Sequence, residues 1–283
     1  LFEDLPCRRE SWGEVVAHHA WLQDPVREWS PEAYEQAQWV CSVCDRLGIP
    51  VINRVERLDN AGKVAAARTL AALGVRTPRM HHINDPEEFR ETFMGLEPPL
   101  FVREDLGHQG AMHRADTPAA VRAIDLSRFK RPVVSELIDV SAASDGLYRK
   151  YRCFIAGDHA VSQHLQVSAT WITRGTARIQ VEKTKQEELA YIGAPDPNAT
   201  ILQRARRALG LDLVGFDYGY DREGRMVVWE ANPYPYIKFA GDITTYRNGA
   251  LHRSVLAMVW MYLDIGAVPY PGAVKRLIEK EPW

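Results

Sequence analysis

The sequence of 283 residues predicts an α+β protein, built from separate helices and antiparallel hairpins. Two segments, 31–47 and 249–265, carry apolar residues at helical spacing. Between them, two strand-like runs within 213–232 flank a turn that ends in Gly224, which is the pattern of a β-hairpin. A chain of this length can bury a substantial core in two or three packed units.

The first predicted helix covers residues 31–47. Ser30 is a favoured N-cap residue, a proline follows in the first turn, and Gly48 suits the left-handed conformation that ends helices. Cys41 and Cys44 have CxxC spacing, but the chain has no second CxxC or histidine pair at zinc-finger spacing. Because the helix has its apolar stripe there, we interpret both as reduced core cysteines.

The remaining elements follow from turn residues and strand-like runs. We expect strands at 49–53, 100–103, 132–139 and 151–165, helices at 60–73, 197–209 and 249–265, and a short helix opened by Thr117 and Pro118. The polar, glycine-containing stretch 173–185 suits either a mobile lid or a plain exposed loop.

Composition excludes several classes of protein. The net charge of -2, from 35 basic and 37 acidic residues, gives no reason to expect nucleic acid as a partner. No apolar run approaches the roughly 20 residues needed to cross a bilayer, and the first residues lack the apolar core of a secretory signal. We therefore expect a cytoplasmic protein, and a homo-oligomer is left open. Because the sequence starts at Leu1 and not at Met, the N-terminal domain is expected to be incomplete.

The predicted hairpin carries the most informative polar residues. Side chains alternate along a strand, so Met226, Val228, Glu230 and Asn232 are expected to share one face. If the turn holds an even number of residues, Asp217 lies on that face too. Three converging oxygen donors suit Mg²⁺, which keeps water or phosphate in its other positions. The alternative is that the two acids are solvent-exposed charges at the strand edge.

This hairpin resembles the closing signature of ATP-grasp enzymes, through Gly215-Phe216-Asp217 and Val228-Trp229-Glu230-Ala231-Asn232-Pro233. The resemblance extends over residues 49–235, and it implies an ATP-grasp fold in which two α+β lobes clasp the nucleotide. We expect these lobes at 77–137 and 138–283, after an α/β N-terminal domain at 1–76. By the same resemblance, the cofactors are ATP and one or two Mg²⁺, with Mn²⁺ as an alternative, and the metal ligands are Asp217, Glu230 and Asn232.

The resemblance also assigns the nucleotide-binding residues. Lys63 would approach the nucleotide, although a lone helical lysine is usually solvated. Arg103 stands where the family usually has lysine, and it would meet the phosphates unless it pairs on the surface with Glu104 or Asp105. The loop that closes over the triphosphate would comprise Gly107, His108, Gln109 and Gly110. Glycines there would let backbone N–H groups approach anionic oxygens.

The hinge between the lobes would meet the adenine edge through Glu136, Leu137 and Ile138. Either Asp139 or Asp145 would then bind the ribose hydroxyls, and the sequence does not choose between them.

A strand at 148–158 resembles the D-x-R-x-F motif of glutathione-synthetase-like and glutamate-adding ligases. By that resemblance Arg152 stabilises charge on the transferred phosphoryl group and is the catalytic residue. The acid of the motif is replaced by Lys150, which leaves the local ion pairing open.

The resemblance predicts a Mg-ATP-dependent ligase that forms an amide bond through an acyl phosphate. The alternatives are a small-molecule phosphotransferase and a catalytically weak nucleotide-binding module. The partners would be a small-molecule carboxylate and an amine, such as amino acids or peptides. Tyr234, Tyr236 and Lys238 suggest either an aromatic-walled acceptor site or simple packing against the last helix.

Overall fold

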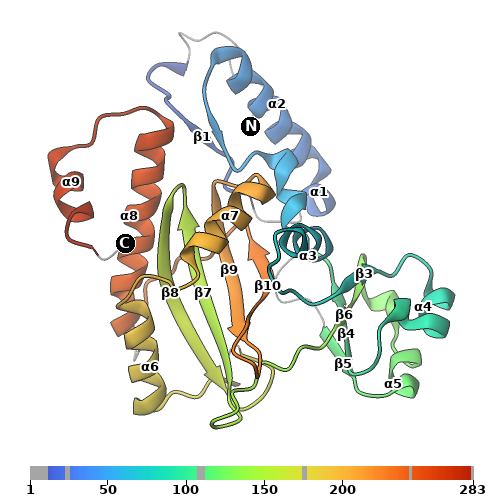
Figure 1. The fold of residues 1–283 in the computed structure, drawn as a ribbon. Helices are drawn as coiled ribbons and strands as arrows, with labels where there is room; N and C mark the ends of the chain where they lie inside the picture. The colour runs from blue at the N-terminus through green and yellow to red at the C-terminus, as the bar shows by residue number, and fades with distance from the viewer. Residues whose placement is uncertain (1–11, 23–25, 107–111, 174–176, 242–243, 282–283) are drawn as a thin grey trace.

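The computed structural model describes residues 12–22, 26–106, 112–173, 177–241 and 244–281. Two four-stranded antiparallel sheets dominate it (Figure 1). The first sheet has the order β3 (Met80–His82), β6 (Pro132–Glu136), β4 (Leu100–Glu104) and β5 (Met112–Ala115). The second has the order β10 (Met226–Asn232), β9 (Leu213–Tyr220), β7 (Tyr148–Ala156) and β8 (His159–Ser168). A short parallel pair joins β1 (His18–His19) to β2 (Val51–Ile52).

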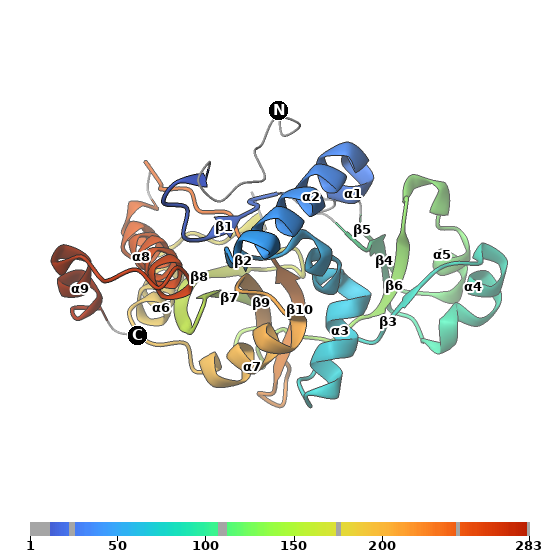
Figure 2. The same ribbon diagram turned by 90° about the horizontal axis from the view of Figure 1, so that it is seen from above.

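Nine α-helices among the described residues pack around these sheets. They are α1 (Val26–Trp29), α2 (Pro31–Leu47), α3 (Lys63–Ala72), α4 (Pro86–Thr92), α5 (Pro118–Arg122), α6 (Glu182–Ile192), α7 (Ala199–Leu209), α8 (Asn248–Ile265) and α9 (Gly272–Ile278). The view from above shows α4 and α5 with the first sheet at one end of the molecule, and α8 and α9 at the other (Figure 2). None of the helices in the described ranges is long and apolar enough to cross a membrane.

Helix α3 connects the two sheets through its side chains. Ala66 and Leu70 belong to the core that the second sheet buries. Val64 and Ala67 pack with Met80 of the first sheet in a separate cluster. One helix thus buries side chains against both sheets, which fixes them relative to each other.

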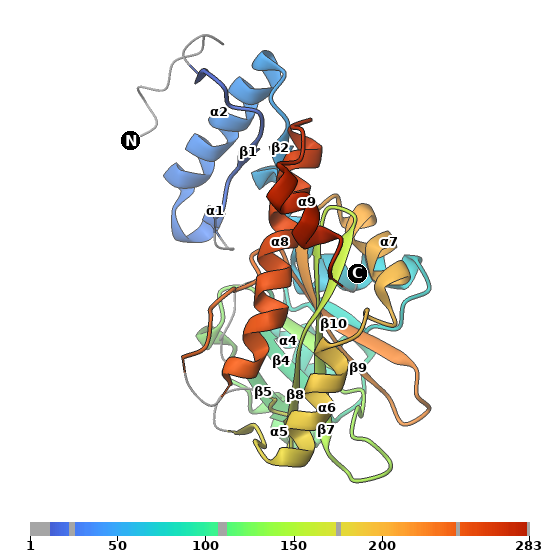
Figure 3. The ribbon, with the colours of Figure 1, turned by 90° about the vertical axis from the view of Figure 1, so that its left-hand side faces the viewer.

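Helices pack on both faces of the second sheet. On one face, Phe216 and Tyr218 pack against Leu202 and Leu209 of α7. On the opposite face, Phe154 packs against residues of α8, and Figure 3 shows α6 and α8 beside β8. Because side chains alternate along β7, the face that α8 covers at one end also carries the side chains of 150 and 152 at the other.

Several predicted elements are confirmed. Helix α2 has the predicted bounds, with the Ser30 side chain accepting from the N–H of Ala33 and Gly48 in the left-handed region at φ +67°. The hairpin and α8 also lie where the pattern indicates. The predicted helix at 60–73 is shorter, because a 3₁₀ turn over Val55–Ala61 precedes α3.

The interpretation of 173–185 as a lid or loop is wrong for its last residues, since α6 begins at Glu182. The side chain of Thr184 bonds back to the N–H of Val181 and fixes this helix start.

Candidate functional site

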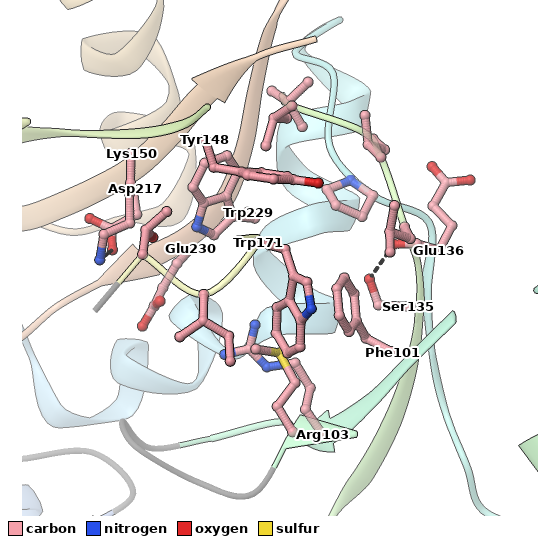
Figure 4. A pocket seen from close by; sticks show the side chains of 18 of the residues that line it. Phe101, Arg103, Ser135, Glu136, Tyr148, Lys150, Trp171, Asp217, Trp229 and Glu230 are labelled. Atoms are coloured by element: carbon pink, nitrogen blue, oxygen red, sulfur yellow. Dashed lines mark hydrogen bonds and ion pairs between the residues drawn. The ribbon is translucent and has the colours of Figure 1, made fainter. Parts of the chain in front are cut away.

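The candidate site is a cleft between the two sheets. Figure 4 shows the arrangement: Phe101, Arg103 and Ser135 come from the first sheet, and Lys150, Asp217 and Glu230 from the second. The full lining is Pro78, Met80, Phe101, Arg103, Met112, Arg114, Ser135, Glu136, Leu137, Ile138, Val140, Tyr148, Arg149, Lys150, Trp171, Ile172, Thr173, Asp217, Val227, Trp229 and Glu230. The segment that joins the sheets, including Leu137 and Ile138, lines the cleft as well.

A β-bulge shapes the acidic side of the cleft. Val228 pairs with Tyr218, but the next pair is Glu230 with Asp217, so Trp229 is an extra residue in β10. The prediction that Val228 and Glu230 share a face is therefore wrong, because the bulge shifts the alternation by one residue. Val228 is fully buried in the core, whereas Trp229 and Glu230 both line the cleft.

The same bulge brings the predicted oxygen donors to one face. Asp217 and Glu230 are a directly opposed cross-strand pair, and Asn232 lies two residues further along β10, opposite Gly215. The side-chain oxygen of Asn232 accepts from the N–H of Tyr234 at 2.8 Å, which orients the amide. Carboxylate and amide oxygens suit Mg²⁺, and the partial shell leaves positions for phosphate and water, so the donor set fits the metal.

Asp217 is buried between two cations. Arg152 donates to its two carboxylate oxygens at 2.6 and 2.8 Å, and Lys150 donates to Oδ2 at 3.1 Å. Burial opposes ionisation of Asp217, but the charges of Arg152 and Lys150 outweigh burial and hold its pKa well below the usual value. Asp217 is thus a fixed anion whose charge is already compensated.

His164 lies opposite Arg152 on the neighbouring strand β8. Burial and the nearby positive charges of Arg152 and Lys150 lower the pKa of His164 well below its ordinary value. A neutral imidazole beside the guanidinium adds no charge, so the Arg152–Asp217 pair has a neutral neighbour at neutral pH.

The first sheet supplies the opposite wall of the cleft. Arg103 on β4 lines it, as do Glu136, Leu137 and Ile138. The carboxylate of Glu136 binds Arg79 through the side chain at 2.7 Å and through the backbone N–H at 3.0 Å. Figure 4 shows this carboxylate at the side of the cleft away from Asp217.

Among the described residues, five predicted site residues lie outside the lining: Arg152, Asn232 and three of the nucleotide-binding residues. Lys63 is buried, and its ammonium group donates to the backbone carbonyl of Asp105 at 2.7 Å. Asp139 pairs with Arg222 at 2.9 Å, and Asp145 pairs with Arg149 at 2.8 Å.

The predicted phosphate loop, Gly107, His108, Gln109 and Gly110, lies outside the described residues.

The predicted acceptor-site residues also stand apart from the cleft. Tyr234 packs edge-on against Trp21 at 5.2 Å between ring centroids. Tyr236 is 68% exposed, and Lys238 is exposed as well.

Sequence reasoning missed the aromatic and basic lining of the cleft. Phe101 and Trp171 meet across it at 4.8 Å between ring centroids, although they come from β4 and from the segment after β8. Arg114 and Arg149 also line the cleft, where Arg114 pairs with Asp116 and Arg149 pairs with Asp145 and Glu187. Alternation along β4 could have identified Phe101 and Arg103 as one face, but Trp171 lies in a loop where no periodicity applies.

Known proteins that resemble this chain are found by comparison of structures and not of sequences. No protein-family model matches the sequence, and no curated protein matches it by sequence either. The D-alanine–D-alanine ligase of Coxiella burnetii is similar with a TM-score of 0.50 and 15% identity, over 85% of this chain and 65% of the ligase. The ATP-grasp ligase PsnB, in complex with a minimal precursor, matches with a TM-score of 0.49 and 19% identity, over 82% of this chain and 74% of PsnB.

At such identities the likeness establishes architecture and no more. The likeness to the D-alanine–D-alanine ligase extends over 85% of this chain. This chain has the ATP-grasp fold.

Proposed function

We propose that the protein is a Mg-ATP-dependent carboxylate–amine ligase. The observation that carries the proposal is the opposed pair Asp217 and Glu230, which lines a cleft that also gathers Arg103, Arg149 and Lys150. Acids that can hold a metal ion, surrounded by cations, suit a bound polyphosphate with Mg²⁺. Residues 77–137 and 138–283 would form the two lobes around the nucleotide.

The proposal gives each side of the cleft a role. The backbone of Leu137 and Ile138 would meet the adenine edge, beside the contacting rings of Phe101 and Trp171. Arg103 would neutralise phosphate charge from the first sheet. Mg²⁺, or Mn²⁺ in its place, would be held by Glu230, with Asn232 and Asp217 completing the set; the ion supplies charge neutralisation of the phosphates.

The reaction would take place in two displacements. An oxygen of the substrate carboxylate attacks the γ-phosphorus, the bond between γ-phosphorus and the bridging oxygen breaks, and ADP leaves. The amine then attacks the carbonyl carbon of the acyl phosphate, loses a proton, and inorganic phosphate leaves with the bonding electrons. Arg152 would stabilise the negative charge that develops on the phosphoryl oxygens, with its orientation fixed by Asp217.

An isotope-transfer experiment tests this chemistry. Amino acids and dipeptides with ¹⁸O in the carboxylate are screened with ATP and Mg²⁺ for phosphate release that depends on an added amine. Acyl-phosphate formation transfers one ¹⁸O atom to the released phosphate. Phosphate without ¹⁸O contradicts the mechanism, and ATP-dependent phosphorylation of a hydroxyl assigns the protein as a phosphotransferase instead.

A further inference from the structure

A second pocket lies at the outer edge of β8, apart from the cleft. It is bounded by α6, by residues 178–181 and by the segment that precedes α8. Figure 3 shows α6 and α8 beside β8, with the edge strand between them. We refer to it as the Glu188 pocket, and its lining is Leu165, Val167, Arg178, Ile179, Gln180, Val181, Glu182, Thr184, Lys185, Glu188, Thr244, Tyr246 and Arg247.

Glu188 is the buried acid of this pocket, with 2% of its side chain exposed. One of its oxygens accepts from the N–H of Leu165 on the edge strand, which leaves the other for the pocket. That second oxygen accepts from Arg247 at 2.5 Å and from the hydroxyl of Tyr246 at 2.7 Å. Glu188 is therefore already well satisfied by its neighbours.

The cations around the pocket exceed what Glu188 can balance. Arg178 lies 3.8 Å from the same oxygen of Glu188, which is too long for a hydrogen bond. Lys185 adds a third positive charge, over the ring of Tyr246 at 5.7 Å. Glu182, the other acid of the lining, lies 3.7 Å from the ammonium group of Lys185, but 71% of its side chain is exposed, so solvent screens this pair.

The two arginines also carry unused donors. Each side chain is only 13% exposed. Within the described ranges, the buried Nε atoms of Arg178 and Arg247 have no hydrogen-bond partner. Buried N–H groups without a partner are rare in native proteins, and a planar guanidinium binds a carboxylate through two parallel hydrogen bonds. Since the two Nε atoms are closed off from solvent, an anion in the pocket would meet the outer nitrogens of these guanidinium groups.

The Glu188 pocket and the cleft share parts of the chain. Trp171, Ile172 and Thr173 line the cleft, and residues 178–185 line the Glu188 pocket a few positions later. On β8, Leu165 lines the pocket, while its neighbour His164 lies opposite Arg152. The charge of Arg178 also reaches His164 and helps to lower the pKa of that imidazole, so the pocket lies close to the strand position that faces Arg152.

We propose that the Glu188 pocket binds a second carboxylate of the substrate, such as the free α-carboxylate of an amino acid or the C-terminal carboxylate of a peptide. This inference rests on the proposed ligase function for the meaning of the bound group, but carboxylate binding itself needs no ATP. It names the substrate class: a molecule that keeps one free carboxylate while its other group reacts in the cleft.

Direct binding of paired probes tests the inference. N-acetyl-L-alanine, its neutral amide and inorganic phosphate are titrated into the whole protein without nucleotide, and binding is followed by ligand-observed NMR. We expect the carboxylate to bind and the amide not to bind. Arg178→Gln should weaken binding about ten- to hundredfold, the effect of losing a hydrogen bond to a charged group.

Two further variants complete the test, one in the pocket and one on the surface as a control. Lys185→Gln, on the exposed side of the pocket, should also weaken carboxylate binding and serves if Arg178→Gln does not fold. Arg90→Gln is the matched control, because Arg90 is a surface arginine on α4 that pairs with Glu87. Its carboxylate affinity should equal that of the wild type.

Three results would overturn the inference: equal binding of the amide, carboxylate binding unchanged in both pocket variants, or binding of phosphate in place of the carboxylate. An ATP analogue should bind all these variants as it binds the wild type, since neither residue lines the cleft. Failure of carboxylate binding with intact nucleotide binding would therefore reject the Glu188 pocket alone. Loss of nucleotide binding in the wild type would reject the ligase function.

Discussion

At the scale of single residues, Asp217 is the most constrained group of the cleft. It is 2% exposed and accepts hydrogen bonds from Arg152 and Lys150. Removing one partner of a buried ion pair is far more destabilising than removing a surface pair. Lys150, which stands where the related motif has an acid, therefore has a specific structural partner in this chain.

Arg103 tests the contribution of the first sheet to nucleotide binding. Arg103→Ala should weaken ATP binding by about 1.5–3 kcal/mol, the usual value for hydrogen bonds to charged groups. Calorimetric titration of ATP with Mg²⁺ measures it. The control is Arg128→Ala, because Arg128 is exposed and does not line the cleft. An affinity that is equal in both variants would remove Arg103 from the phosphate site.

Substitution of Arg152 distinguishes an effect on ATP binding from an effect on the rate of phosphoryl transfer. If it acts on charge that develops during phosphoryl transfer, Arg152→Ala should lower single-turnover phosphate release by about 10²–10³. The Kd for ATP should change by less than about tenfold, since contacts from the first sheet persist. Both quantities are measured on the same variant, by calorimetry and by rapid quench.

The buried position of Arg152 calls for a folding control. Arg152→Lys keeps a positive charge beside Asp217, so it should remain folded and still lose much of the rate, because a lysine cannot reproduce the two parallel hydrogen bonds to the carboxylate. A folded Arg152→Lys with normal turnover and normal ATP affinity would reduce Arg152 to a structural residue of β7.

At the scale of elements, the bulge in β10 decides which side chains reach the cleft. Strand alternation predicted that Asp217, Glu230 and Asn232 share a face, and the register agrees. The same reasoning placed Val228 with them, and that is wrong. A bulge is defined by two residues opposite one on the partner strand, so it cannot be read from one strand alone.

Gly219 offers a test of this element. A Cβ there would lie 2.9 Å from both the carbonyl oxygen of Arg149 and the Trp229 ring, which is too close for real contacts. Gly219→Ala should therefore displace Trp229 and destabilise the protein by about 1–3 kcal/mol, the usual cost of overpacking. Chemical denaturation measures the loss of stability, and tryptophan fluorescence reports the shift of the ring.

Gly249→Ala is the control for that substitution. Gly249 lies in α8, and a Cβ at this position would meet no other atom within 4 Å, so alanine there should be neutral or slightly stabilising. Equal stability of Gly219→Ala and the wild type, with unchanged fluorescence, would contradict the close packing of Trp229 on the hairpin.

Helix α6 shows where periodicity fails. Its sequence from Glu182 to Glu188 is almost entirely polar, so no apolar stripe distinguishes it from a loop. The structure explains the polarity: Glu188 is buried because Arg247 and Tyr246 satisfy it from a segment about 60 residues away. Because these partners are so distant in sequence, the residues around Glu188 do not indicate that it is buried.

At the scale of the whole molecule, the sequence predicted the order of the parts better than their contacts. The two-sheet architecture follows from the strand patterns and the resemblance. In the structure, Lys63 contacts Asp105, Asp139 pairs with Arg222, and Asp145 pairs with Arg149. Charged residues can be located in a sequence, but which charges meet depends on how α3 and the sheets pack.

We propose that the cleft between the sheets binds ATP through a metal ion held by the β9–β10 hairpin. Glu230 and Glu223 lie on the same hairpin, but Glu230 lines the cleft and Glu223 is exposed in the turn, paired with Arg225. The change to glutamine at each position therefore gives a matched pair.

The decisive measurement is calorimetric titration of a non-hydrolysable ATP analogue, with and without Mg²⁺, into the wild type, Glu230→Gln and Glu223→Gln. We predict that Mg²⁺ strengthens binding to the wild type and to Glu223→Gln. In Glu230→Gln this gain should shrink by at least about tenfold, the lower end of what even outer-shell changes cost at metal sites. An equal Mg²⁺-dependent gain in all three proteins would show that Glu230 does not hold the metal ion.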